Sequence, residues 1–182
     1  MTVNFSLLVW GGFALVLAWA VGAYSRLNRL RDQMVRSRSS MLKYAAMYRS
    51  LCNDKHLPQG DRSASADPGG QLLSALHAAV EALQKPLADS EKDAKDPGAA
   101  QALGAALDVV QSGIEALAAV PDDLAGARWP LEERNRWIEL AADVRIRRSR
   151  YNVQVGELRE AVEQMPAALL ARVTGTSAWA EV

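Results

Sequence analysis

Apolar side chains recur every three or four residues along most of the chain beyond residue 25. The first such series is Leu27, Leu30, Met34, Met41, Tyr44, Tyr48 and Leu51. This spacing places the series on one face of an α-helix. No Gly or Pro lies between Tyr24 and Leu51, so we expect the helix to continue from the apolar segment before it. It should end near 53–57, before Pro58.

Two shorter helices are predicted next. One begins near Gln71, and Pro86 should kink or end it. The other covers Ala99 to Val120. The apolar faces of these two helices are formed by Leu72, Leu73, Leu76, Val80, Leu83 and Leu87, and by Leu103, Leu107, Val110, Ile114 and Leu117.

A fourth, long helix is predicted from Leu131 to Gln164, about 50 Å in length. Pro130 suits its first turn, and the acidic pair that follows suits the positive end of the helix dipole. Arg148 is the one charged residue in its apolar series. That series is Trp137, Leu140, Val144, Tyr151, Val155, Leu158, Val162, Met165 and Leu169.

Polar segments rich in Gly, Pro, Ser and Asp separate the predicted helices, and no segment alternates with the period of a strand. We expect loops near 56–70, 88–98 and 121–128. Short connections favour antiparallel neighbours. The predicted fold is all-α, with an N-terminal transmembrane helix over 1–25 and an elongated antiparallel four-helix bundle over 26–182.

The first segment is uncharged from Thr2 to Ser25. Its apolar run, Phe5 to Tyr24, would span about 30 Å as a helix, the thickness of a hydrocarbon core. Tyr24 stands where an aromatic residue of the membrane interface would lie. These features favour an uncleaved transmembrane helix.

Two other interpretations compete for this segment. A buried helix of a water-soluble protein can be equally apolar. A cleaved signal peptide is the stronger rival, because Ala18-Trp19-Ala20 and Val21-Gly22-Ala23 resemble cleavage sites. However, residues 1–4 carry no Lys or Arg, and the run exceeds the ~7–15 residues typical of the apolar region within a signal peptide.

Charge changes this picture only when its position along the chain is considered. The whole chain has 21 basic and 21 acidic residues, which argues against nucleic-acid binding. Residues 26–50, the basic collar, carry seven basic and one acidic residue, a balance of +6, whereas residues 51–182 carry −6. The positive-inside rule then predicts the N-terminus outside and the bundle in the cytoplasm.

The residues expected at the membrane interface are Tyr24, Arg26, Arg29, Arg31, Arg36, Arg38 and Trp179. The arginines would attract anionic lipid head groups, at about 1 kcal/mol each, or would only set topology. For Trp179 the alternative to bilayer contact is a frayed chain end. The lipid bilayer is thus the first expected partner.

Few residues of the sequence could bind a metal or act in catalysis. Cys52 and His56 have the spacing of two ligands on one helix face, but only the distant His77 could add a third. Cys52 as a nucleophile would need a base and an orienting partner. We therefore expect no metal, no cofactor, no catalytic residue and no identifiable small-molecule substrate. A site assembled with a partner protein stays the remaining route to an enzyme.

Four arginines cluster within 145–150. They could form a patch for an acidic partner or a phosphate, or they could pair with acidic residues of the second and third helices. The neighbouring Tyr151-Asn152 pair could form a buried polar contact that fixes the register of the helices.

Two stretches resemble the LemA family of bacterial membrane proteins. One is Tyr24-Ser25-Arg26-Leu27-Asn28-Arg29-Leu30-Arg31, and the other is Arg148-Ser149-Arg150-Tyr151-Asn152-Val153-Gln154-Val155, followed by Met165-Pro166. The turn Val120-Pro121-Asp122-Asp123-Leu124 is similar to the turn before the family's last long helix. Ser25 departs from the family's usual Asn, and the match is weak over 52–118.

The resemblance implies an antiparallel helical bundle on a single membrane anchor, in a bacterial inner membrane. The family-motif positions are Leu27, Leu30, Arg31, Pro121, Arg148, Tyr151, Asn152, Val155 and Pro166. It implies no established catalytic activity. The expected function is a non-enzymatic interaction or scaffold module that binds a protein partner or itself. The alternative is a sensor or regulator that transmits a signal through the first helix.

Overall fold

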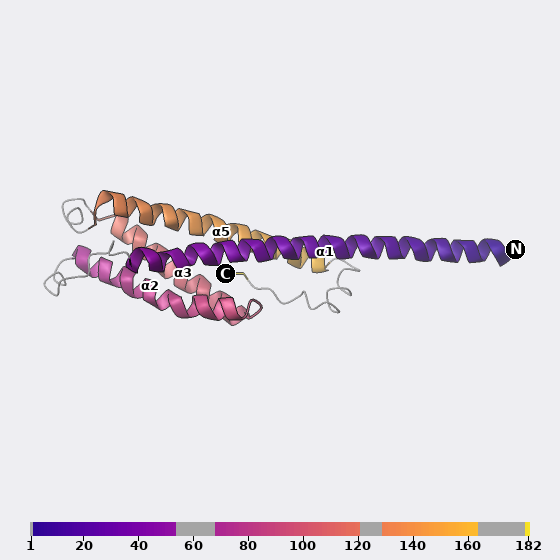
Figure 1. Cartoon of the computed structure of the whole chain (residues 1–182), viewed down its shortest axis with the longest axis horizontal. Coiled ribbons are helices and arrows are strands. Elements are labelled where there is room, and N and C mark those ends of the chain that lie inside the picture. Colours follow the sequence, from indigo (N-terminus) through magenta and orange to yellow (C-terminus); the bar gives the residue numbers. More distant parts are fainter. Residues whose placement is uncertain (1, 54–67, 121–128, 164–180) are drawn as a thin grey trace.

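The computed structural model describes residues 2–53, 68–120, 129–163 and 181–182. Four helices account for its regular structure: α1 (Thr2–Asn53), α2 (Pro68–Lys92), α3 (Pro97–Ala118) and α5 (Leu131–Glu163) (Figure 1). Within these ranges there is no strand. The predicted all-α bundle of four helices is confirmed.

The helices form two antiparallel pairs (Figure 1). α1 packs along α5, α2 packs along α3, and smaller contacts join α1 to α2 and α3 to α5. α1 has 52 residues, a length of about 78 Å. Its second half lies in the bundle, and its first part projects beyond the other helices (Figure 1).

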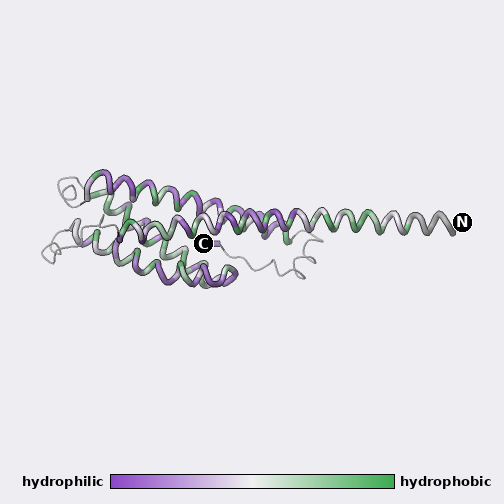
Figure 2. Tube along the Cα trace, in the orientation of Figure 1, coloured by the Kyte–Doolittle hydropathy of each residue, from purple (hydrophilic) through white to green (hydrophobic). Residues whose placement is uncertain are grey.

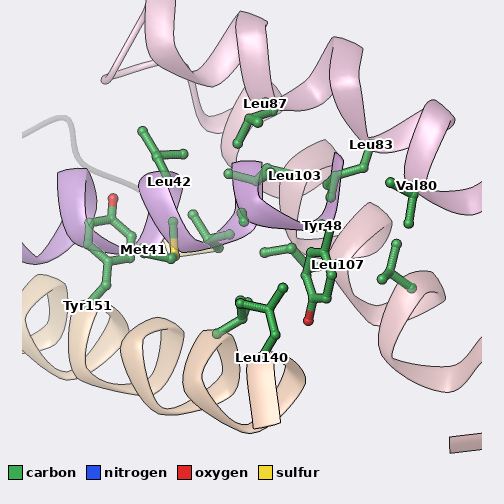
Figure 3. Packing of buried hydrophobic residues seen from close by; sticks show 14 of the residues in the cluster. Met41, Leu42, Tyr48, Val80, Leu83, Leu87, Leu103, Leu107, Leu140 and Tyr151 are labelled. Carbon is green, nitrogen blue, oxygen red and sulfur yellow. The ribbon is translucent and has the colours of Figure 1, made fainter. Parts of the chain in front are cut away.

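The core consists of the predicted apolar faces, which meet between the four helices (Figure 3). Every predicted position on α3 is buried, and so are most of those on the other helices. Leu30, Tyr44, Leu51, Leu72 and Val162 are partly buried at its edge. The three–four spacing thus identified the core faces correctly, because that spacing keeps side chains on one side of a helix.

The projecting part of α1 is largely hydrophobic (Figure 2), and its large apolar side chains are exposed. At least half of the surface of each of these residues is exposed: Val9, Trp10, Phe13, Leu15, Val16 and Leu17. Among the residues that the structure describes, no helix is long and apolar enough to cross a membrane. The transmembrane span expected over 1–25 is therefore not confirmed.

Two expected breaks differ from the structure. α2 begins at Pro68 and continues through Pro86 to Lys92, so the loop predicted over 88–98 shrinks to 93–96. An interior proline costs a helix about 3 kcal/mol. Here the turn after Pro86 buries Leu87 and Ser90, and burying a leucine side chain offsets about 1.5–3 kcal/mol of that cost.

The starts of α3 and α5 follow local sequence signals. Asp96 caps α3 by accepting a 2.8 Å hydrogen bond from the Gly98 main-chain N–H, and Pro97 occupies the first turn. The first turn of α5 contains Glu132 and Glu133, as predicted. α5 begins at Leu131 directly after Pro130.

Some predictions fall outside the described residues. These are the loop at 121–128, most of the loop at 56–70, the fourth helix's end at Gln164, and the individual residues His56, Pro121, Met165, Pro166, Leu169 and Trp179. α1 passes through residue 25 without a break. The boundary expected between an anchor and a bundle thus lies inside one helix.

Candidate functional site

Two polar residues of α5, Arg148 and Asn152, stand one helical turn apart and face α3 and Val182. The apolar series of α5 places Leu140 and Val144 before them and Val155 after them, all buried. Arg148 and Asn152 are themselves half-buried. The helix therefore presents a guanidinium and an amide at a place where its other positions are apolar.

Val182 lies against these two side chains. The Asn152 amide donates from Nδ2 to the main-chain oxygen of Val182 at 2.9 Å, and its Oδ1 accepts from the Val182 main-chain N–H at 3.1 Å. Arg148 Nε donates to the same Val182 oxygen at 2.7 Å. Both polar main-chain atoms of Val182 are thereby satisfied by α5 side chains.

Gly104 of α3 lies on the other side of Val182 from Asn152. A Cβ atom at this position would lie 2.8 Å from the Val182 carbon C and 3.3 Å from Arg148 Nη2. The first distance is shorter than atoms tolerate, and the clash is with main chain, which cannot rotate away. A glycine inside a helix costs about 1 kcal/mol relative to alanine. At Gly104 that cost accompanies the close approach of Val182, whose surface is only 7% exposed.

Charged residues frame this contact. The Arg148 guanidinium also pairs with the Asp108 carboxylate of α3, through Nη1 to Oδ1 and through Nη2 to Oδ2 at 3.3 Å. The Asp108 side chain is 62% exposed, so this pair contributes little to stability. Arg159 lies 3.6 Å from the carboxylate of Glu181, the residue before Val182.

Two openings lie along α5. One is an open groove lined by Arg145, Arg148, Ser149, Asn152 and Val153. The other, of about 180 Å³, lies between α3 and α5 and has a largely apolar wall, lined by Gln111, Ile114, Glu115, Ala118, Ile138, Ala141, Ala142 and Arg145. The second opening is consistent with the small contact between these two helices.

The predicted interface residues on α1 divide into two groups. Tyr24, Arg26, Arg29, Arg31 and Arg36 are exposed. Arg38 instead reaches α2, where it donates to the main-chain oxygen of Ser90 and, at 3.1 Å, to Ser90 Oγ. Carbonyls in the last turn of a helix lack partners within that helix, so Arg38 caps the end of α2.

The arginine cluster at 145–150 also divides. Arg148 pairs with an acidic residue of α3, as the pairing hypothesis expects. Arg147 turns to α1, where it donates to Ser40 Oγ at 2.8 Å and its guanidinium carbon lies 3.5 Å from the Tyr44 ring centroid. Arg145 and Arg150 are exposed. The sequence did not indicate the contact with Tyr44, because it joins residues far apart in the chain.

The remaining candidates lie apart. Cys52 is buried, and that burial, with a smaller contribution from Glu81, raises the pKa of its thiol to about 11. A reactive cysteine needs a lowered pKa, so this environment disfavours a nucleophile. His77 is exposed. Among the described residues no three His, Cys, Asp or Glu side chains gather as a metal site.

The family-motif positions that the structure describes lie mainly where α1 and α5 pack. Leu27, Tyr151 and Val155 are buried, Leu30 is partly buried, and Arg31 is exposed. Burial raises the pKa of the Tyr151 hydroxyl, although nearby Arg38 opposes the rise. Asn152 bonds Val182, a contact that the expected role in helix register did not include.

Comparison with protein-family models, curated proteins and solved structures finds no match to this chain. The resemblance to the LemA family thus depends on the sequence motifs alone.

Proposed function

We propose that this protein is a membrane-anchored, non-enzymatic interaction or scaffold module whose bundle lies at the cytoplasmic face of a bacterial inner membrane. The observation that carries the proposal is the first part of α1. It projects from the bundle and exposes large apolar side chains while remaining continuous with the helix that builds the core.

Exposure of this apolar surface to water is unfavourable, so we expect it to be buried in another apolar environment. Each large apolar side chain moved out of water contributes about 1.5–3 kcal/mol. Trp10 and Leu15, for example, are 68% and 73% exposed. A hydrocarbon interior would cover this surface on all sides of the helix at once.

The membrane helix would consist of the whole uncharged run of the sequence. No helix among the described residues is by itself long and apolar enough to cross a membrane. The side chains that the structure places begin at Val9, and Phe5, Leu7 and Leu8 precede them in the sequence. With these residues the run reaches the twenty residues that a membrane helix needs.

Orientation follows from the basic collar. Arg26, Arg29, Arg31 and Arg36 follow the apolar run directly and are exposed. Under the positive-inside rule they retain this end of the anchor in the cytoplasm. The bundle, which continues from the same helix, would then be cytoplasmic and its α1 would point away from the membrane.

We further propose LemA-family membership. What supports it is that Leu27, Tyr151 and Val155 of the two motifs are all buried in the core that includes both α1 and α5. Residues at such positions shape the packing of the two long helices.

One observation favours the alternative of a transmembrane sensor. α1 is unbroken from Thr2 to Asn53, so a displacement of its first part is transmitted to the core. A proline at Ser25 tests this. Ser25→Pro should uncouple the two parts and abolish signalling while leaving the bundle folded, and unchanged signalling would contradict the sensor.

The leading proposal is tested by membrane fractionation and by a cytoplasmic reporter fused after Val182. The wild type should sediment with membranes and resist carbonate extraction, with an active reporter. The double variant Leu15→Arg/Val16→Arg should become extractable, whereas the matched variant Val109→Arg/Val153→Arg, on exposed positions of the bundle, should not. A soluble wild type, or an active periplasmic reporter, contradicts the proposal.

The interaction role is tested by purification in mild detergent. A homo-oligomer or an enriched protein partner is expected. A strictly monomeric chain without any enriched protein would count against a scaffold.

A further inference from the structure

The contact between Asn152 and Val182 has the form of a peptide clamp. A primary amide presents one donor and one acceptor, and here they meet the oxygen and the N–H of a single residue at 2.9 and 3.1 Å. An amide used this way binds the main chain of a peptide whatever its side chain. A bundle residue placed only for packing would not need both atoms.

We propose that Gly104, Arg148 and Asn152 form a docking site for an extended peptide in which an acidic residue precedes a valine. Glu181-Val182 of the chain itself occupies this site in the present structure. The inference rests on the proposed function as an interaction module and gives the chemistry of its partner.

The shape of the site selects a peptide that lies close to α3. Gly104 leaves room for main-chain atoms where any larger residue would collide with Val182 at 2.8 Å. The valine becomes part of the core cluster, with 7% of its surface exposed. A small branched side chain therefore fits the position.

Charge favours an acidic residue before the valine, by a small amount because both side chains of the ion pair are more than half exposed. Arg159 lies 3.6 Å from the Glu181 carboxylate. Arg148 adds a charge-assisted hydrogen bond to the Val182 oxygen at 2.7 Å, which is stronger than a bond between neutral groups. Arg159 thus binds the acidic side chain, and Arg148 and the Asn152 amide bind the main chain of the residue that follows it.

An open groove adjoins the site, from which a peptide could enter. The groove lined by Arg145, Ser149 and Val153 adjoins Arg148 and Asn152. A segment of the same chain competes for the site at a high effective concentration, because it cannot diffuse away. A partner peptide with the same two residues must displace Glu181-Val182 of the chain itself. The partner therefore binds only when its concentration or affinity is high enough to compete.

The experiment uses the full chain in detergent micelles and a labelled peptide of sequence Ala-Trp-Ala-Glu-Val, with fluorescence anisotropy as the readout. The peptide should bind a chain lacking residues 181 and 182 at least about tenfold more tightly than the wild type, because the tethered competitor is gone. Peptides with a free carboxylate and with a terminal amide distinguish a terminal carboxylate from an internal carbonyl as the group that Arg148 binds.

Matched variants identify the clamp. In the shortened chain, Asn152→Ala, Asn152→Asp and Gly104→Val should each weaken binding at least about tenfold. Their controls are Asn135→Ala, at an exposed position of α5, and Gly156→Val, where an added side chain meets nothing within 4 Å. Circular dichroism verifies that each variant is folded.

Equal binding of the peptide by the clamp variants and their controls would overturn the proposal, as would equal binding of a scrambled peptide. Absence of binding to a folded shortened chain would overturn it too. None of these results depends on where the protein lies in the cell, so failure here is distinct from failure of the membrane proposal.

Discussion

Tyr48 of α1 and Trp137 of α5 stack in the core, with ring centroids 5.8 Å apart and planes inclined by 22°. Both side chains are almost wholly buried, at 2% and 0% exposure. Stacked aromatic pairs contribute about 0.5–1.5 kcal/mol beyond the area they bury. This pair joins the two longest helices on the buried faces that they share, and Figure 3 shows Tyr48 among the buried residues.

Replacing Trp137 tests this contact. Trp137→Ala should lower the free energy of unfolding by about 3–5 kcal/mol, measured by urea denaturation, because it leaves a large cavity. Trp137→Phe should cost less, since it keeps a ring against Tyr48 and removes an indole Nε1 that has no hydrogen-bond partner among the described residues. Equal costs for the two variants would contradict the stacking argument.

Arg38 and Arg36 lie two residues apart on α1 but have different surroundings. Arg38→Ala should destabilise the bundle by about 1–3 kcal/mol, because it leaves the main-chain carbonyl and the hydroxyl of buried Ser90 without their donor. Arg36→Ala, at an exposed position, should change stability by less than about 0.5 kcal/mol. Thermal denaturation of both variants in the same detergent makes the comparison. Equal midpoints would refute the capping role.

The buried thiol of Cys52 should react slowly. With a pKa raised from 9.0 to about 11, its thiolate fraction at pH 8 is about a hundredfold lower than that of an ordinary thiol. Alkylation by iodoacetamide at pH 8 should therefore be at least about a hundredfold slower in the native chain than in guanidinium. A native rate close to the denatured one would show that the thiol is accessible and unperturbed.

The bundle should lose stability in alkaline solution. The folded-state pKa of Cys52 lies above its ordinary value of 9.0, so its contribution is complete below pH 9 and is lost as the pH rises toward 11. Burial also raises the pKa of Tyr48 and Tyr151, which extends the decline above pH 10. Urea denaturation at pH 7, 9 and 10 should show this, with a shallower slope for Cys52→Ala. A stability independent of pH over this range would contradict it.

Pro86 should be replaceable with a gain in stability. It lies inside α2, where it removes one helical hydrogen bond. Pro86→Ala should raise the free energy of unfolding by about 1–3 kcal/mol, measured by urea denaturation against Lys85→Ala on the exposed face. A loss of stability would mean that the ring itself makes packing contacts that outweigh the restored bond.

Some features of the fold could be predicted because they depend on residues close in sequence. The three–four spacing gave the buried faces of all four helices, and Pro130 with its acidic neighbours gave the start of α5. The prediction that Pro86 ends its helix is wrong, whereas the alternative prediction of a kink stays a prediction. The local cost of Pro86 is visible in the sequence, whereas the burial of Leu87 and Ser90 that compensates it is not.

The residues of the candidate site likewise divide into those that the sequence indicated and those that it did not. Arg148 stood out as the charged residue in an apolar series, and Asn152 belonged to a motif. Gly104 gave no signal, because it is one of three glycines in an alanine-rich helix and no pattern distinguishes it from the others. Arg38 was grouped with its basic neighbours, since charge along the chain does not reveal which side of a helix meets another helix.

The sequence by itself determined the helical architecture, the faces that form the core and the uncharged run of α1, since each follows from periodicity or composition within one segment. Only the tertiary structure decided that Arg38 caps α2, that Tyr48 stacks on Trp137 and that Val182 lies between Gly104 and Asn152. These contacts join residues 30 or more positions apart. Their geometry exists only after hydrophobic packing has fixed the distance between the helices.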